Sequence, residues 1–403
     1  MSHACSKKLI SGLIFGMSSS VAMAAGFQLF EQNASGIGNA FAGSAAVAEN
    51  ASTIYHNPAG MTQLRTFEIS TGIAAAKSSI KFSNNDSAGS AGNAGRWLTT
   101  PNAYLSWGIT KDLYAGIGIS RPFGYKINYG GHWAGDEQAM KFDLRTVNIN
   151  PSLAYRVNER VSLGFGLNWQ KFDAEHSRLA RDEWGGEIGT GRLKLNDSAI
   201  GWNAGALFTV SPSTRVGVAY RSRIRLKTTG DGAWVDNGGI EQGRLSTNLT
   251  MPDTFAWSVA QRISGRWDML GGVTWTGWKS CGKVSFIGVD NNPVRTLDPD
   301  FRNTWRVALG ANYRFSDAWR FRYGIAYEQS PVRGARGSPV VSMPDNNRYW
   351  FSFGTQWLHG KSSRLDLGLA YIYMNNFGVN VNHLSGNYSS SFWIFGGQYS
   401  VAF

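Results

Sequence analysis

Strict alternation of apolar residues with polar or small ones recurs along most of this chain. In residues 305–315 the odd positions are Trp, Val, Leu, Ala, Tyr and Phe, while Arg306 and Arg314 stand among small residues at even positions. Side chains of a β-strand point alternately to its two faces, so a period of two predicts strands rather than helices. Similar runs occupy residues 319–327, 365–373 and 393–403.

The two faces of these strands call for two different surroundings. One face is rich in aromatic and aliphatic residues, and the other carries Arg306, Arg320 and Arg322 near mid-strand. A soluble sandwich would rarely bury such guanidinium groups without partners. A transmembrane barrel accommodates both faces, because lipid meets the apolar one and an enclosed lumen meets the polar one. The alternation therefore predicts an all-β transmembrane barrel.

Connections of two lengths predict the number of strands. Short turns are expected near 110–111, 158–159, 211–213, 264–265, 316–318 and 360–362. Long polar loops are expected at 81–96, 125–138, 175–191, 229–243, 280–300, 330–346 and 375–390. Six turns and seven loops join fourteen antiparallel strands over residues 65–403. An even number of strands can close without leaving an edge that lipid could not satisfy.

The N-terminal part of the chain does not follow this alternation. Residues 1–24 have the features of a removable secretory signal, because Lys7 and Lys8 precede a short apolar core and an Ala-Met-Ala cleavage site. Residues 25–64 are rich in Gly, Ala, Ser and Asn. We expect them to form short, closely packed helices that fold back into the lumen as a plug, called the hatch below. A loose periplasmic tail is the alternative.

Several segments, taken together, resemble the outer-membrane long-chain fatty acid transporter family (FadL/TodX-like). Those in the hatch are Ala25–Leu29, Ala34–Gly43 and Asn57–Met61. Those in the predicted barrel are Gly201–Gly205, Tyr220–Ser222, Met251–Asp253, Trp305–Gly310 and Asp345–Trp350. The resemblance implies a 14-stranded barrel with a mostly helical hatch plugging its lumen. It also implies passive uptake of hydrophobic compounds, long-chain fatty acids above all, with lateral release through a gap in the wall.

The third predicted strand contains a residue that a closed wall does not favour. Pro122 has no N–H to donate, so with Gly124 it predicts a local kink. The resemblance makes Arg121, Pro122, Phe123 and Gly124 the lateral opening, although the family has a small polar residue and Asn where this chain has Arg121 and Pro122. Alternatively, Pro122 only ends the strand near the outer rim.

Candidate ligand-binding residues follow from the resemblance. Arg178, just past the expected strand 161–172, matches the family's carboxylate-contacting arginine, and arginine can bind a carboxylate through two hydrogen bonds. The alternative is a solvated loop charge. The family's partnering lysine has no exact match here: Leu297 falls nearest, and Arg295 or Arg302 could substitute.

Two further sites lie in the hatch. Phe27 resembles the N-terminal aromatic residue that occupies the family's binding pocket before transport, and simple hatch packing is the alternative. Asn57, Pro58 and Ala59 match the family's hatch motif, in which a side-chain hydrogen bond and the restricted φ of proline fix a turn. The sequence does not separate gating from structure at this motif.

No constellation typical of an enzyme, a metal site or a cofactor site is found, since the six histidines are scattered and no nucleophile motif occurs. We expect a monomer of the bacterial outer membrane that binds a hydrophobic small molecule and no nucleic acid. The formal net charge is +12, or about +10 without Lys7 and Lys8, and this excess favours contact with anionic lipopolysaccharide. Attraction of an anionic ligand is the alternative. Uptake of aromatic hydrocarbons is the alternative function. An outer-membrane enzyme would need a Ser/His or Asp/His group at one rim, and none is apparent, whereas a general porin would lack the hatch.

Overall fold

The computed structural model describes residues 27–85, 89–182, 184–236, 239–288, 293–298, 300–333, 341–360, 362–381 and 384–403. The predicted signal peptide, residues 1–24, lies outside the described residues. None of the helices in the described part of the chain has the length and hydropathy needed to cross a membrane.

Twenty strand segments are found in the described residues, and all belong to one sheet. They are β1 (Phe67–Asn84), β2 (Ala91–Asn93), β3 (Trp97–Gly108), β4 (Leu113–Ser120), β5 (Gly124–Asn128), β6 (Lys141–Arg156), β7 (Val161–Arg181), β8 (Glu187–Ser211), β9 (Thr214–Arg221), β10 (Ile224–Asp236), β11 (Gly239–Met251), β12 (Thr254–Arg262), β13 (Trp267–Thr276), β14 (Val284–Ile287), β15 (Pro293–Leu297), β16 (Thr304–Arg314), β17 (Trp319–Glu328), β18 (Arg348–His359), β19 (Ser363–Val381) and β20 (Leu384–Ala402).

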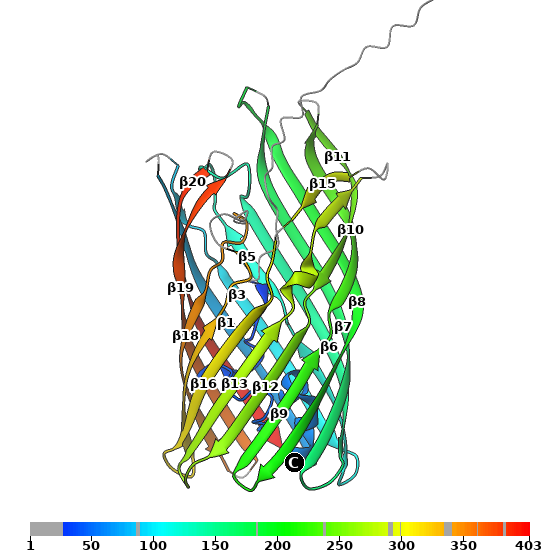
Figure 1. The fold of residues 1–403 in the computed structure, drawn as a ribbon, viewed down its shortest axis with the longest axis vertical. Coiled ribbons are helices and arrows are strands. Elements are labelled where there is room, and N and C mark those ends of the chain that lie inside the picture. Colours follow the sequence, from blue (N-terminus) through cyan, green and yellow to red (C-terminus); the bar gives the residue numbers. More distant parts are fainter. Residues whose placement is uncertain are drawn as a thin grey trace, which may run out of the picture.

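These segments build a closed barrel of fourteen antiparallel strands (Figure 1). Six barrel strands consist of two segments each, namely β2–β3, β4–β5, β9–β10, β11–β12, β13–β14 and β15–β16. β1 pairs with β20 from Glu68 opposite Ala402 to Asn84 opposite Gly386, and this pairing closes the wall. The predicted strand number and closure are confirmed.

Exposure alternates along the wall as the sequence predicts. Trp305 and Leu309 on the outward face of β16 are 50% and 57% exposed, whereas Arg306 between them is 4% exposed. Arg322, on β17, is fully buried. The apolar face is therefore outward, and the arginine face points into a lumen that is filled at this level.

Several strands extend further than the sequence analysis expects. Of the predicted loop 175–191, only the residues near 182–186 lie outside strands among those described, and most of 229–243 and 375–390 also lies in strands. β7 and β8 stay paired from Val161 opposite Phe208 to Ala180 opposite Gly189. Antiparallel neighbours can keep their hydrogen bonds in water as well as in lipid, so polar side chains there do not mark a loop.

The hatch lies inside the barrel, near the end that carries the short turns and the C-terminus (Figure 1, blue). It contains α1 (Ala34–Gly38), α2 (Thr53–His56) and the 3₁₀ helix η2 (Pro58–Gln63), joined by turns. α1 packs against β18–β20, and η2 against β6–β8. Glycine in the wall allows this close approach: a Cβ at Gly324 would lie 2.1 Å from the carbonyl carbon of Asn39.

Candidate ligand cavity and wall break

A small apolar cavity lies in the lumen beyond the hatch. Its lining comes from β6, β7, β8, β11 and β14 and consists of Phe142, Phe172, Ala174, His176, Leu193, Leu195, Leu249, Val284 and Phe286. Among these described residues only His176 is polar. The cavity measures about 30 Å³, room for about two water molecules. A hydrophobic ligand can enter only if side chains move.

Arg178 lies on the same face of β7 as three of the cavity residues. Residues of even number from Phe172 to Arg178 point inward. Arg178 therefore follows His176 along that face, towards the end of the barrel opposite the short turns. Its pairing partner is Gly191, which has no side chain to compete for space. The sequence pattern predicts a strand that ends at residue 172, with Arg178 just past it. Arg178 is instead held within the wall, half-buried, because β7 runs on to Arg181.

The two candidates for a second cation are placed differently. Arg302 is half-buried and holds the connection that follows β17: its Nε donates to the Ser330 carbonyl at 2.9 Å, and its backbone N–H donates to the Pro331 carbonyl at 3.0 Å. The backbone of Arg295 pairs with that of Phe286, a cavity residue. The side chain of Arg295 lies outside the described residues.

Phe27 is fully buried in a box of aromatic rings. Its ring centroid lies 4.9 Å from that of Trp278, which begins the short 3₁₀ helix η3 (Trp278–Cys281), and 5.5 Å from that of Phe123. Phe27 also belongs to the same hydrophobic core cluster as the cavity residues Phe142, Phe172 and Leu195. The hatch thus begins with a ring packed into the apolar interior from which the cavity opens.

The wall is interrupted where the sequence places Pro122. Pairing between β3 and β4 ends at Ala103 opposite Ile119, and β4 itself ends at Ser120. Beyond this point, no continuous ladder joins the two sides among the described residues. The isolated bridge from Gly95 to Ile127 and a few single hydrogen bonds connect them. In a continued register, Arg121 would face Pro101 across the gap, and neither Pro101 nor Pro122 has an N–H to donate.

The hatch supplies hydrogen bonds that the broken ladder lacks. The Leu29 N–H donates to the Pro122 carbonyl at 2.8 Å, and Gln28 forms a bridge with Phe123. The Gln32 side chain donates to the Arg121 carbonyl at 2.7 Å and accepts from the Arg121 N–H at 3.2 Å. The first residues of the hatch therefore pair with the wall at its break.

A wall side chain completes this arrangement. The Thr146 hydroxyl accepts from the Phe123 N–H at 3.0 Å and donates to the Phe123 carbonyl at 2.7 Å. Neither Gln32 nor Thr146 is among the site residues predicted from the sequence. Thr146 is one of a row of buried polar residues on β6, with Asn148 and Asn150, and nothing in the sequence distinguishes it from them.

Asn57 anchors the hatch to the wall. Its side-chain nitrogen donates to the carbonyls of Ala45 at 2.7 Å and of Ala206, on β8, at 3.0 Å. Its oxygen accepts from the N–H of Ala59 at 3.1 Å, and Pro58 occupies the first turn of η2. These hydrogen bonds hold the turn and its contact with β8.

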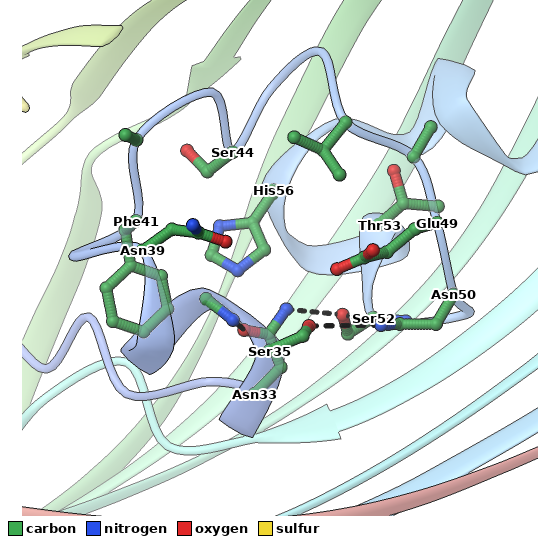
Figure 2. Close-up of a pocket in the computed structure, with 14 residues that line it drawn as sticks. Asn33, Ser35, Asn39, Phe41, Ser44, Glu49, Asn50, Ser52, Thr53 and His56 are labelled. Atoms are coloured by element: carbon green, nitrogen blue, oxygen red, sulfur yellow. Dashed lines mark hydrogen bonds between the residues drawn. The ribbon is translucent and has the colours of Figure 1, made fainter. Parts of the chain in front are cut away.

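A polar pocket of about 30 Å³ lies inside the hatch itself (Figure 2). Asn33 donates to the Ser52 hydroxyl at 2.5 Å, and Asn50 donates to the Ser35 hydroxyl at 3.1 Å. His56 also lines the pocket, and burial together with the nearby Arg221 lowers its pKa to about 3. His56 is therefore neutral at physiological pH, and these hydrogen bonds join the hatch segments that line the pocket.

Two acidic residues of the hatch have opposite electrostatic surroundings. Burial would raise the pKa of Glu49, but Arg322 at 3.0 Å and Arg320 at 3.7 Å outweigh burial and lower that pKa to about 2. Arg322 also binds Asp366 at 2.9 Å. Burial raises the pKa of Glu31 to about 7, and one of its oxygens has no hydrogen-bond partner among the described residues.

A plugged barrel with an apolar belt outside, and an apolar cavity inside, defines an outer-membrane transporter of hydrophobic compounds. The chain belongs to the family described as outer membrane protein transport protein (OMPP1/FadL/TodX), whose model matches residues 16–403. This membership places the protein in the bacterial outer membrane. The family consists of transporters rather than enzymes.

Curated relatives match the chain over most of its length. The long-chain fatty acid transport protein of Salmonella typhi is 26% identical over 425 residues, with 96% of each chain covered. Outer membrane protein P1 of Haemophilus influenzae is 30% identical over 400 residues, with 87% of this chain and 86% of the relative covered.

Solved structures share the fold. A Pseudomonas aeruginosa FadL homologue has a TM-score of 0.86 at 22% identity, with 94% of this chain and 100% of that chain covered. The Ralstonia pickettii toluene transporter TbuX has a TM-score of 0.72 at 17% identity, with 92% and 99% covered. At these identities the likeness concerns the fold alone.

Proposed function

We propose that this protein takes up long-chain fatty acids by diffusion and releases them sideways into the membrane at the break formed by Arg121, Pro122, Phe123 and Gly124. The observation that carries the proposal is the shared inward face of β7. Arg178 follows the apolar residues Phe172 and Ala174 on that face. A fixed cation beside an apolar cavity is complementary to a ligand with a carboxylate head and a hydrocarbon tail.

The path of the ligand follows from the position of the hatch. Phe27 fills the aromatic box, and the residues directly after it pair with Pro122 and Phe123. Withdrawal of this one segment would therefore empty the box and unpair the wall together. The ligand then moves from the cavity to the break without crossing the hatch. Residues 25–64 act as the plug, and residues 65–403 as the conduit.

Uptake of aromatic hydrocarbons is the second candidate. The cavity lining favours this candidate, because His176 is the single polar residue among the described lining residues. The names of two solved relatives, TbuX and TodX, describe toluene transporters. A toluene-sized ligand would need the apolar lining but no cation.

Contact with lipopolysaccharide is a separate part of the proposal. The outward faces of β7 and β8 carry Lys171 and Arg192, which are paired with Asp173 and Glu175, beyond the apolar belt. Mixed charge at this height suits the phosphates of an anionic outer leaflet. We expect the protein to be a monomer in the membrane.

Growth on oleate tests the main proposal. A bacterium that lacks its own long-chain fatty acid transporter is given this protein or an empty vector, with oleate as the carbon source. Growth should depend on the protein, and the variant Arg178→Gln should require more oleate. Arg160→Gln serves as the control, because it removes an arginine from an exposed short turn. Normal uptake of toluene without uptake of oleate would favour the second candidate.

A further inference from the structure

The side chain of Arg121 bridges the two sides of the wall break. Its Nη1 donates to the carbonyl of Thr99, on β3, at 2.6 Å. Its Nε lies 3.4 Å from the carbonyl of Thr146, on β6, which is a weak hydrogen bond. β3 and β6 are the two neighbours of β4, so the guanidinium spans the place where the ladder is missing.

The hydrogen bonds of Arg121 do not neutralise its charge. Both bonds described above go to backbone carbonyls, and among the described residues no ion pair joins Arg121 to a carboxylate. Asp143 acts on Arg121 electrostatically, but both of its oxygens already accept from Arg145, at 2.9 and 2.7 Å. Lys126 also lies 4.0 Å from Asp143. Three cations therefore gather around one carboxylate at the break.

We infer that Arg121 is the gate of the lateral exit and that it selects ligands carrying a carboxylate. This inference rests on the proposed lateral release. In the closed wall, the guanidinium lies across the gap and binds Thr99 and Thr146. During release, it exchanges these carbonyls for the carboxylate of the passing ligand. The substrate class is thus an amphipathic carboxylate, and an uncharged hydrocarbon has nothing to offer Arg121 in return.

The exchange is favourable because of the charges involved. The bonds to Thr99 and Thr146 leave the positive charge unneutralised, whereas a carboxylate neutralises it and can accept two parallel hydrogen bonds from the guanidinium. A carboxylate that enters an apolar wall without a partner is strongly disfavoured. Arg121 supplies the partner at the point where the ligand leaves the lumen. Binding to the carboxylate also removes the guanidinium from the gap, so the ligand opens the exit for itself.

Three variants test the gate: Arg121→Gln, Arg121→Lys and Arg160→Gln. Each is produced in the outer membrane of a strain that lacks its own transporter, and initial uptake of radiolabelled oleate and of radiolabelled p-xylene is measured. Arg160→Gln, in the exposed short turn between β6 and β7, is the control, because it removes a cation without changing the charges around Asp143 and Arg121. Resistance of the barrel to unfolding in mild detergent without heating establishes that each variant is folded.

The ratio of oleate uptake to xylene uptake is the decisive quantity. For Arg121→Gln we expect it to fall about tenfold, as loss of one charge-assisted hydrogen bond predicts. Arg121→Lys should keep part of the ratio, and Arg160→Gln, a surface substitution, should change it less than about twofold. An equal rise or fall for both ligands in Arg121→Gln would overturn the inference, since it would make Arg121 a steric closure only. Uptake of neither ligand by the unaltered protein would instead refute the proposed function.

Discussion

Gln32 in the hatch holds the backbone of Arg121 in the wall through both its donor and its acceptor. The Gln32 nitrogen donates to the Arg121 carbonyl at 2.7 Å, and the Gln32 oxygen accepts from the Arg121 N–H at 3.2 Å. In the hydrogen-bonded pairs of an antiparallel ladder, the opposite residue offers the same pair of groups, one donor and one acceptor. A hatch side chain thus takes the place of a ladder partner, so that movement of the hatch leaves the wall unpaired.

Replacement of Gln32 by Ala should loosen the wall at the break. Without the side chain, the Arg121 N–H has no partner from the hatch, and its amide hydrogen should exchange at least about tenfold faster. Hydrogen exchange with mass spectrometry of a peptide covering residues 119–124 measures this. Gln63→Ala is the control, because Gln63 is an exposed residue of the same hatch. Unchanged protection in Gln32→Ala would mean that the hatch and the wall are not coupled here.

Replacement of Phe27 by Ala separates the two interpretations of that residue. If Phe27 occupies the ligand site, its removal leaves a vacant apolar space, and oleate should bind several-fold more tightly because no ring must be displaced. If the ring only packs the hatch, the variant loses about 3–5 kcal/mol of stability without a gain in affinity. Binding is measured by calorimetry in detergent. Phe30→Ala is the comparison, because Phe30 packs against a different core cluster.

Glu31 should give the barrel a dependence on pH. Because burial raises its pKa in the folded state from 4.5 to about 7, the folded protein binds more protons than the unfolded chain between these values. Stability should therefore fall as pH rises from 4.5 to 7, by up to about 3 kcal/mol from this group. Glu31→Gln should remove that fall and be the more stable protein at pH 8. Urea unfolding at pH 5 and pH 8 measures the difference, and equal slopes in both proteins would rule out Glu31 as the source.

Sequence patterns could predict the wall because lipid imposes a period of two on every strand. Trp305 and Leu309 lie outward and Arg306 inward for that reason. The same patterns misplace Arg178, since a polar outward face beyond the membrane looks like a loop although β8 still pairs with it. Gln32 could not be found in this way. Its partner is the backbone of a residue far along the chain, and no periodicity in the hatch marks it.

Glu49 forms ion pairs between the hatch and the wall, and its replacement should lower the stability of the protein only above acidic pH. Arg322 and Arg320 outweigh burial and lower the pKa of Glu49 from 4.5 to about 2. Its contribution to stability is therefore present above pH 4.5 and is lost as pH falls towards 2. Glu49→Gln leaves the buried Arg322 with Asp366 as its one remaining carboxylate partner among the described residues, and we expect a loss of about 1–3 kcal/mol at pH 7. Urea unfolding at pH 7 and pH 3 should show that the difference in the free energy of unfolding between the variant and the unaltered protein is smaller at the lower pH.

Asp173→Asn is the control. It breaks an exposed pair with Lys171 and should change the free energy of unfolding by less than about 1 kcal/mol at either pH. A loss in Glu49→Gln that stays the same at both pH values would contradict an electrostatic tie.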